Sequence, residues 1–279
     1  MKIIKSPQQM QSVCLALKKK GRAIGFVPTM GALHQGHLSL IRKARKENDI
    51  VAVSIFVNPR QFGPHEDLKK YPRPRVLDLA LCKKSGVDLV FNPEVSGLYP
   101  QNFKTNVYLE GLSQLLCGAS RPEHFRGVTT IVAKLFNIVQ PDSAYFGQKD
   151  GQQTVIIKRM AEDLNFPVKI KVLPTLREKD GLAMSSRNIY LNKIQRQDAL
   201  ALNKALGLAR LLIACGQKDS AKIMAKMRGL IEKKKSAKID YLAAVDMNNL
   251  KPVKRVTRNC LIALAVKIGK ARLIDNIII

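Results

Sequence analysis

Short apolar runs alternate with amphipathic segments along most of the first 176 residues. The apolar runs, each of strand length, lie at 23–27, 49–57, 87–91, 143–146 and 168–173. Apolar residues recur at helical spacing at 10–20, 128–139 and 152–165, after residue 37, and between Pro74 and Gly86. A nearly continuous apolar run is typical of a strand buried on both faces of a parallel sheet. The alternation therefore predicts an α/β fold, a Rossmann-like parallel sheet with helices on its faces.

The pattern changes at about residue 193. Two long helical patterns are followed by three strand-like runs, at 193–215 and 219–235 and then at 239–245, 261–268 and 273–279. Helices and strands that do not alternate are typical of an α+β arrangement. We predict two domains, a Rossmann-like domain at residues 1–176 and a smaller C-terminal α+β domain at residues 177–279.

Polar or glycine-containing segments directly follow several of the predicted strands. These segments are residues 28–37, 58–62, 147–153 and 176–188. Right-handed crossovers bring the C-terminal ends of parallel strands to one edge of a sheet, and ligands of open α/β sheets bind at that edge. The coincidence predicts that these segments form the functional site.

The first of these segments contains two of the four histidines in the chain. It leads from a predicted strand through a turn with Gly31 and Gly36 into an amphipathic helix. The N-terminus of a helix offers unpaired N–H groups and the positive end of the helix dipole, which suits phosphate. His34 and His37 are three residues apart and lie on one face of such a helix. We interpret them as donors to phosphate oxygens rather than as half of a zinc site, because no H-E-x-x-H pattern accompanies them.

The segment at 147–153 follows a predicted strand and opens the next helix. Lys149 is a candidate phosphate contact, and Asp150 is a candidate acceptor for a ribose hydroxyl. The alternative is an ordinary helix N-terminus that Asp150 caps.

The segment at 177–188 is polar and dense in hydrogen-bond donors. Ser185, Ser186 and Arg187 together suit a triphosphate. The alternative is a surface loop that joins two domains, and such a loop could also close over a nucleotide. Neither a Walker A sequence nor G-x-G-x-x-G occurs, so the pattern predicts neither a P-loop kinase nor a dinucleotide-binding fold.

Neutral amide side chains lie beside two of the predicted strand ends. Gln61 and Gln153 could bind a small hydroxy acid, or they could cap loops. Of the other two histidines, His124 stands among the donors of residues 121–127, and His65 is assigned to a loop.

The chain is strongly basic, with a formal charge of +27 at pH 7, and positive charge is densest from residue 177 onward. A basic balance of this size suits nucleic acid. However, aromatic residues make up only 5%, tryptophan is absent, and basic and aromatic residues do not interleave as they do in base-stacking proteins. We interpret the charge as a solvated basic surface and expect no nucleic-acid partner.

The sequence predicts neither a membrane span nor a disulfide framework. No apolar run approaches the roughly 20 residues that cross a bilayer, and the N-terminus lacks the apolar region of a signal peptide. The five cysteines are odd in number, scattered, and never spaced as C-x-x-C. A reducing compartment suits such cysteines, so we expect a cytoplasmic location.

Taken together, the segments that follow the strands resemble one family closely. The matching segments are 28–38, 56–62, 121–128, 146–153, 177–188 and 271–276. In order and spacing they are similar to pantoate–β-alanine ligases (pantothenate synthetases). The first segment alone indicates only the wider nucleotidyltransferase superfamily with an H-x-G-H signature. Two positions differ from the usual family pattern, with Glu123 where glycine is common and Leu176 where valine is common.

The resemblance implies an ATP- and Mg²⁺-dependent condensation of pantoate with β-alanine. A first step would give pantoyl adenylate and pyrophosphate, and a second step would give pantothenate and AMP. The family is typically a cytoplasmic homodimer whose small C-terminal domain acts as a lid. Mg²⁺ would be held mostly by phosphates and water, without a dedicated set of protein ligands.

The resemblance also implies roles for individual residues. His37 matches a proton donor, and His34, Lys149 and Arg187 would act with it on the phosphates. Gln61 would contact both acids, Gln153 would contact pantoate, and Asn58 would join them in binding substrate. The residues that would line the ATP site are Met30, Gly31, Ala32, Leu33, His34, Gln35, Gly36, His37, Gly147, Gln148, Lys149, Asp150, Leu176, Met184, Ser185, Ser186 and Arg187.

Two other classes of function remain alternatives. A truncated class I aminoacyl-tRNA synthetase shares the H-x-G-H signature and would explain the positive charge, but no anticodon-binding module is recognisable. Its lysine-rich loop is only approximated by residues 184–187. A non-catalytic RNA-binding module would explain the charge as well, but it would have no use for paired histidines at an anion site.

Overall fold

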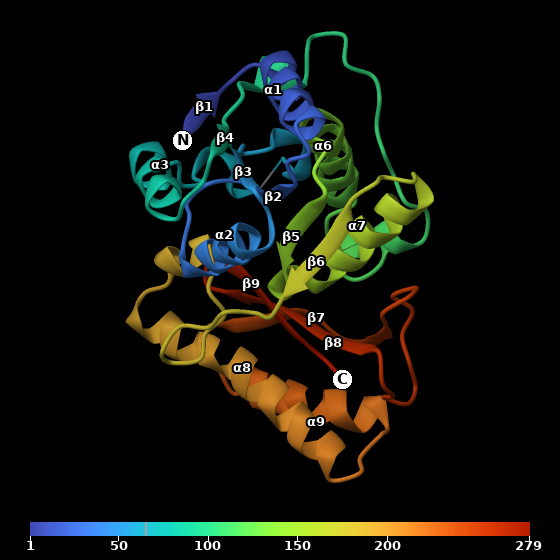
Figure 1. The fold of residues 1–279 in the computed structure, drawn as a ribbon. Helices are drawn as coiled ribbons and strands as arrows, with labels where there is room; N and C mark the ends of the chain where they lie inside the picture. The colour runs from blue at the N-terminus through green and yellow to red at the C-terminus, as the bar shows by residue number, and fades with distance from the viewer. Residues whose placement is uncertain (65) are drawn as a thin grey trace. The chain divides into compact units, whose positions relative to one another are not determined.

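The computed structural model describes residues 1–64 and 66–279. It divides into two compact units (Figure 1). The first unit consists of Met1–Ser113, Arg121–Gly147 and Ile156–Leu173, and the second of Gln114–Ser120, Gln148–Val155 and Pro174–Ile279. The domain division after residue 176 stays a prediction, because grouping by contact does not decide which part of a chain folds by itself.

The first unit is built on a six-stranded sheet in which every pair of neighbouring strands is parallel. The strand order is β1-β4-β3-β2-β5-β6. The strands are β1 (Lys2–Ile4), β2 (Ile24–Thr29), β3 (Ile50–Ile55), β4 (Leu89–Phe91), β5 (Ser143–Gly147) and β6 (Lys169–Leu173). The predicted Rossmann-like parallel sheet is confirmed. Strand β1 was not predicted, because it is an edge strand of three residues of which only Ile4 is buried.

Long helices connect these strands. They are α1 (Pro7–Lys19), α2 (Gln35–Glu47), α3 (Arg75–Lys84), α6 (His124–Val139) and α7 (Gly151–Asp163). Short helical turns are η1 (Pro59–Gln61), η2 (Asp67–Lys69), α4 (Val95–Leu98), η3 (Leu112–Gln114), α5 (Cys117–Ser120) and η4 (Gln148–Asp150). Helix α6 begins four residues before the predicted start at Val128, because its first turn has a single apolar residue, Phe125, and contains Gly127.

Helices α2 and α3 pack on the sheet through one apolar cluster. Ile41 of α2 and Cys82 of α3 lie in this cluster with Val27 of β2, Val53 of β3 and Tyr145 of β5, and all five side chains are fully buried. The cluster fixes where α2 begins relative to the end of β2. It therefore fixes the position of the histidine turn that joins them.

The strand order reverses between β2 and β5. From β2 the sheet continues through β3, β4 and β1, and from β5 it continues through β6 in the opposite direction. A reversal of this kind is the topological switch point, where a crevice opens beyond the C-terminal ends of the strands. β2 leads at this edge into the segment Met30–His34, and β5 ends at Gly147. The fold thus sets the histidine turn at the usual ligand-binding position of an open α/β sheet.

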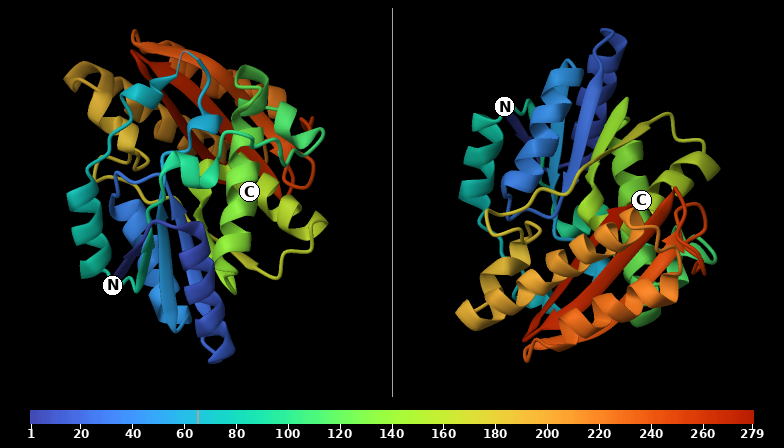
Figure 2. Two further views of the ribbon diagram at one scale, coloured as in Figure 1. Left: turned by 90° about the horizontal axis from the view of Figure 1, so that it is seen from above. Right: turned by 90° about the horizontal axis from the view of Figure 1, so that it is seen from below.

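The second unit contains a three-stranded antiparallel sheet of β7 (Ala237–Asp246), β8 (Cys260–Ile268) and β9 (Ala271–Ile278). Helices α8 (Lys193–Ala214) and α9 (Ser220–Glu232) lie side by side along this sheet (Figure 2). Leu206 and Met227 of the helices share an apolar core with Leu264 of β8. The predicted α+β arrangement is confirmed. Within residues 1–64 and 66–279, no helix has both the length and the apolar composition that crossing a bilayer requires.

The C-terminal end of α2 is held by a network around Glu47. Its carboxylate accepts hydrogen bonds from Lys171 at 2.7 Å and from the Tyr145 hydroxyl at 2.8 Å, and it pairs with Lys43 at 2.7 Å. These contacts, Lys171 first, lower the pKa of Glu47 from 4.5 to about 2. The ionised carboxylate therefore stabilises the fold fully above about pH 4.5, and this contribution is lost as the pH falls toward 2.

Glu47→Gln is expected to lower the melting temperature at pH 7, because a neutral amide cannot pair with two lysines. The difference from the wild type should shrink as the pH falls from 5 to 2, which thermal melts at several pH values measure. Glu94→Gln is a matched control, since Glu94 is exposed and lies 4.0 Å from Lys5. A Glu47→Gln effect of constant size at every pH would contradict the proposed linkage.

Candidate functional site

A buried network holds the turn that follows β2. The Thr29 hydroxyl accepts a hydrogen bond from the Gly31 N–H at 3.1 Å and donates to the Ser54 carbonyl at 2.7 Å. The Asp78 carboxylate accepts from the N–H groups of Ala32 at 2.9 Å and Leu33 at 2.7 Å. Asp78 belongs to α3 and is only 1% exposed. Contacts with β3 and with α3 therefore hold the turn in place.

Thr29 lies in the segment 28–37 that was predicted to form the site but was given no role of its own, and Asp78 was not identified from the sequence. A signal for Asp78 was nevertheless present. It lies four residues before Cys82, on the same face of α3, and both residues are buried. A carboxylate on the apolar face of a helix requires buried donors, and here those donors are the amides of the histidine turn.

The space beside Gly31 excludes a side chain. Its φ is +81°, and a Cβ would lie 2.9 Å from Asp78 Oδ2 and 3.1 Å from Ile55 Cγ2. A left-handed backbone favours glycine, and a side chain here would displace the carboxylate that holds the turn. Glycine is thus required by both conformation and packing.

The two histidines cap the N-terminus of α2. His34 is the N-cap residue, and its Nδ1 accepts a hydrogen bond from the Gly36 N–H at 3.1 Å. The Nδ1 of His37 accepts from the His34 N–H at 3.3 Å, which completes a capping box. The ring centroids are 4.1 Å apart. The predicted placement of both rings at the start of one helix is borne out by this geometry.

The capping contacts determine the tautomer of each ring. A backbone N–H can only donate, so the Nδ1 that receives it carries no proton. The neutral ring therefore has its proton on Nε2, and this nitrogen is a donor. The spacing of three residues thus serves two purposes, since it closes the helix end and gives both imidazoles the donor tautomer that an anion requires.

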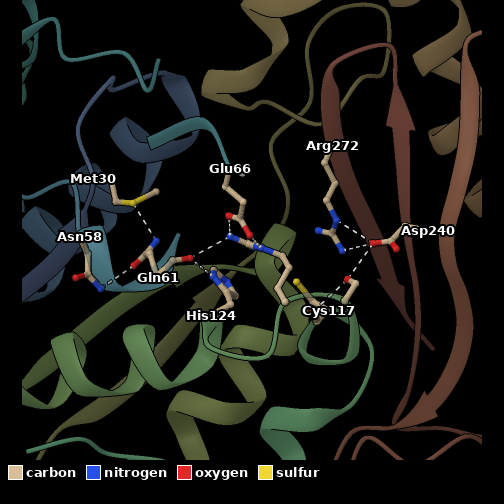
Figure 3. Close-up of polar contacts among 10 residues, drawn as sticks. Met30, Asn58, Gln61, Glu66, Cys117, His124, Asp240 and Arg272 are labelled. Carbon is tan, nitrogen blue, oxygen red and sulfur yellow. Dashed lines mark hydrogen bonds and ion pairs between the residues drawn. The ribbon is translucent and has the colours of Figure 1, made fainter. Parts of the chain in front are cut away.

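Gln61 lies near this turn, at the end of the short helix η1 that follows β3. Its Nε2 donates to the Met30 sulfur at 2.9 Å, and its Oε1 accepts from Asn58 at 3.2 Å (Figure 3). A thioether is a weak acceptor. The amide N–H of Gln61 can therefore exchange this partner for a ligand oxygen at little cost.

Asn58 is held on all sides. Its Nδ2 donates to Gln61 and to the Gly127 carbonyl, the latter at 3.0 Å. Its Oδ1 accepts from the Tyr99 hydroxyl at 2.9 Å and the Arg60 N–H at 3.3 Å. Burial raises the pKa of Tyr99 above its usual range, so that its hydroxyl remains a donor. Two donated and two accepted bonds use the full capacity of an amide, and Asn58 is 1% exposed.

The main chain of Gln61 is anchored by the segment at 121–127. His124 Nδ1 donates to the Gln61 carbonyl at 2.9 Å, and Arg121 donates to the same oxygen at 3.1 Å (Figure 3). Arg121 also binds the Glu66 carboxylate, with its Nε at 2.7 Å from Oε1. A side chain at Gly127 would collide with the carbonyl of Arg60, so only glycine allows α6 to approach η1 this closely. His124 therefore positions Gln61, a role that its sequence neighbours did not reveal.

Apart from Gly147, the last residue of β5, the other predicted ATP contacts belong to the second unit. Residues 148–150 form the turn η4, in which Lys149 Nζ lies 3.6 Å from Asp150 Oδ1. The Lys149 side chain is 22% exposed and that of Asp150 is 45% exposed. A solvated pair of this kind is weak. The ammonium group of Lys149 can therefore leave the Asp150 carboxylate and pair with a phosphate instead.

The segment from Leu176 to Asn188 is an ordered loop within the second unit. Arg177 and Ala183 form an antiparallel bridge, and the Met184 N–H donates to the Leu176 carbonyl at 3.0 Å. The turn η5 (Ser186–Tyr190) begins after Ser185, whose hydroxyl accepts from the Arg187 N–H at 3.3 Å. The structure thus places Ser185, Ser186 and Arg187 together at one helical turn.

The two adjacent glutamines of α7 have different environments. Gln152 is 6% exposed and binds the Cys117 N–H at 3.0 Å and the Leu115 carbonyl at 2.7 Å. Gln153 is half-buried, and within the described residues its side chain has no hydrogen bond. The amide predicted to bind pantoate is therefore available. His65, which was assigned to a loop, lies outside the described residues.

A doubly wound parallel sheet, with a glycine turn and a helix N-terminus at its switch point, defines an α/β protein of the nucleotide-binding class. A match to one family narrows this class. Residues 2–278 match the pantoate–β-alanine ligase family, and the chain belongs to it.

Individual relatives match over almost the whole chain. The pantothenate synthetase of Caldicellulosiruptor bescii is 52% identical over 279 residues, which cover 100% of this chain and 99% of the relative. That of Thermosipho melanesiensis is 53% identical over the same shares. The crystal structure of pantothenate synthetase from Thermus thermophilus is similar, with a TM-score of 0.94, 44% identity and 99% of each chain covered. A pantoate–β-alanine ligase from Francisella tularensis, complexed with βγ ATP and β-alanine, has a TM-score of 0.81 at 37% identity and covers 100% and 97%.

Proposed function

We propose that this protein is an ATP-dependent ligase that joins pantoate to β-alanine and forms pantothenate, AMP and pyrophosphate. The observation that carries the proposal is the match of residues 2–278 to the family, with relatives about half identical over the full chain. The histidine-capped turn at the switch point supports it independently, because phosphate chemistry needs donors at that position.

The reaction proceeds through an acyl adenylate. A carboxylate oxygen of pantoate attacks the α-phosphorus of ATP, and pyrophosphate leaves. The amine of β-alanine then attacks the carbonyl carbon of pantoyl adenylate, loses a proton, and displaces AMP. Adenylation is needed because a carboxylate has no good leaving group, whereas AMP is one. No side chain forms a covalent bond with the substrate in either step.

The chain stabilises the first step electrostatically. His34 and His37 donate from Nε2 to phosphate oxygens whose negative charge increases as the bond to pyrophosphate breaks. Lys149 and Arg187 act on the same charge, and the hydroxyls of Ser185 and Ser186 add neutral donors. The backbone of Met30–Gln35 and Gly147–Asp150, together with Gly36, Leu176 and Met184, completes the proposed ATP contacts.

The amides select the acids. The exchangeable N–H groups of Gln61 bind pantoate and β-alanine, and the available amide of Gln153 binds pantoate. Asn58 has no hydrogen-bonding capacity left for a substrate, so we assign it a positioning role toward Gln61 in place of direct binding. His124 and Arg121 support Gln61 from its carbonyl side.

Mg²⁺ enters this scheme with ATP. Nucleotide-bound Mg²⁺ is held by phosphates and water together with one or two carboxylates. Within the described residues no group of three or more His, Cys, Asp and Glu side chains is arranged for a metal, and the carboxylate of Asp150 lies 3.6 Å from the ammonium group of Lys149. The ion neutralises phosphate charge when it is bound.

Two further properties follow from the family. We propose a homodimer, because this is the usual state of such ligases. We also propose a cytoplasmic location, which suits the free thiols at Cys14, Cys82, Cys117, Cys215 and Cys260. Sedimentation and cell fractionation test these two proposals separately.

One assay tests the proposed reaction. The protein is mixed with ATP, Mg²⁺, pantoate and β-alanine, and AMP and pantothenate are measured. AMP release should require both acids and should stop when EDTA removes the metal. AMP release only with tRNA and an amino acid would instead identify an aminoacyl-tRNA synthetase. No turnover combined with tight RNA binding would identify an RNA-binding module.

Gln61→Glu is expected to raise the KM for pantoate by about 10²-fold, because it replaces an N–H donor by an oxygen and sets a negative charge beside an anionic substrate. The KM for ATP should change far less. Gln101→Glu, at an exposed position of the same unit, adds the same charge and should leave both constants unchanged. Equal increases in the two KM values for Gln61→Glu would contradict a role in acid selection.

A further inference from the structure

The segment 271–276 near the C-terminus has no part in the scheme above. It begins β9, and two of its polar residues, Asp275 and Asn276, are only 2% and 4% exposed. Adjacent residues of a strand direct their side chains to opposite faces. These two side chains therefore reach two different parts of the second unit.

Asp275 holds the loop at 176–188. Its carboxylate binds Arg177 through two bonds, with Nη1–Oδ2 at 2.6 Å and Nη2–Oδ1 at 3.0 Å. Arg177 also donates to the Gly181 carbonyl at 3.2 Å and so closes the turn of the loop. A bidentate pair fixes direction as well as distance. The loop that presents Ser185 and Arg187 is thus fastened to β9 at its second residue.

Asn276 holds the turn η4. Its Nδ2 donates to the Gln148 carbonyl at 2.8 Å and to the Lys149 carbonyl at 2.9 Å. Its Oδ1 accepts from Gln148 Nε2 at 3.4 Å. Both amide hydrogens are therefore spent on the backbone that carries Lys149.

We propose that Asp275 and Asn276 are positioning residues that hold Lys149 and Arg187 at a fixed separation suited to the triphosphate of ATP. All four residues belong to the second unit. β9 pairs with β8 through Leu264↔Asp275 and Ala263↔Asn276, so the anchor is a rigid strand. Donors stabilise developing charge best when they are placed before the reaction. The inference rests on the proposed function, because it assigns a purpose to residues that act on ATP.

Asn276→Asp is the main test, because it keeps the shape of the side chain and replaces its two N–H donors by an oxygen that repels both carbonyls. Pyrophosphate formation from ATP and pantoate should fall by about 10²-fold, the usual effect of a displacement near 1 Å, and the KM for ATP should rise. Conversion of preformed pantoyl adenylate with β-alanine should stay within about 3-fold of the wild type, since this step makes no use of triphosphate contacts.

Gly151→Ala perturbs the same contact without removing it. A Cβ at Gly151 would lie 3.1 Å from the Cγ and Nδ2 of Asn276 and 3.1 Å from Leu261. Alanine is the better helix former at the start of α7, so the fold should hold while Asn276 shifts. We expect the same selective loss of the first step, smaller than in Asn276→Asp. This variant decides the question if Asn276→Asp does not fold.

Asp275→Asn tests the second contact against a matched control. Asp240, on β7 of the same sheet, also binds an arginine, and it accepts from Arg272 of β9 at 2.7 Å. Both Asp→Asn changes remove the carboxylate of an ion pair from the same three-stranded sheet, but only Asp275 holds a proposed ATP-binding loop. The KM for ATP should rise in Asp275→Asn and stay unchanged in Asp240→Asn.

The outcomes separate the two proposals. Wild-type protein that forms no pantothenate would overturn the proposed function itself. Active wild-type protein whose folded Asn276→Asp and Gly151→Ala variants keep both steps intact, or lose both in equal proportion, would overturn the positioning role. A rise in the KM for ATP that is the same in Asp240→Asn and Asp275→Asn would do so as well.

Discussion

His37→Asn should lower the rate of pyrophosphate formation by about 10²–10³-fold, the usual cost of one donor to a developing negative charge, and should leave the protein folded. An asparagine Oδ1 stands where the imidazole Nδ1 stands, so it can still accept the His34 N–H that is now 3.3 Å from His37. What the variant lacks is Nε2, the donor proposed for the phosphate. Rapid measurement of pyrophosphate with ATP and pantoate checks the rate.

His37→Ala separates the two roles of the ring. Alanine removes the helix cap as well as the donor, so this variant should be as inactive as His37→Asn and also less stable, by about 1 kcal/mol. Denaturant unfolding of the two variants gives the difference. Near-normal turnover in His37→Asn would show that the capping contact was the only function of His37.

Asp78→Asn should reduce turnover by about 10²-fold although Asp78 touches no substrate. Its two oxygens accept the N–H groups of Ala32 and Leu33, and an amide would direct a donor at one of them. A buried N–H without a partner costs about 1–3 kcal/mol, and the turn that carries His34 would relax to recover it. Steady-state kinetics and thermal melts measure the two effects.

Asp142→Asn is the control for this effect. Asp142 accepts the Ile24 N–H at 2.7 Å and Lys18 at 3.0 Å, so it holds the beginning of β2 as Asp78 holds the turn after its end. Both variants should lose stability, but Asp142→Asn should keep the kcat of its folded fraction. Comparable losses of kcat in both would mean that Asp78 supports the fold and not the histidine turn in particular.

Local pattern was sufficient for most of the elements and misleading for a few. Strands β2, β3 and β5 and helices α1, α8 and α9 were predicted from periodicity, because each has a buried face long enough to repeat. Strand β1 was missed, since it is a short edge strand in which only Ile4 is buried. The predicted start of helix α6 was four residues too late, because the residues of its first turn contact η1 and do not continue the apolar pattern. Packing decided both cases.

Asn58 illustrates why site residues are harder to predict than elements. As a polar residue after a strand it matched a substrate contact, and only the contacts show that its four bonds are already made within the fold. His124 and Asp78 show the converse. Asp78 stands outside every segment that was selected from the sequence, and His124 was noted only as one donor among several, yet each holds a part of the proposed site in place.

The sequence by itself determined the class of fold, the family, and the residue types that can act on a phosphate, because periodicity and short motifs depend on neighbours in the chain. The tertiary structure decided which residues hold others in place. Asp78 reaches the histidine turn across 45 and 46 positions, and Asn276 reaches η4 across 127 and 128. Contacts between such distant residues depend on packing and leave no periodic signal, so the supporting residues of the site emerge only from the folded protein.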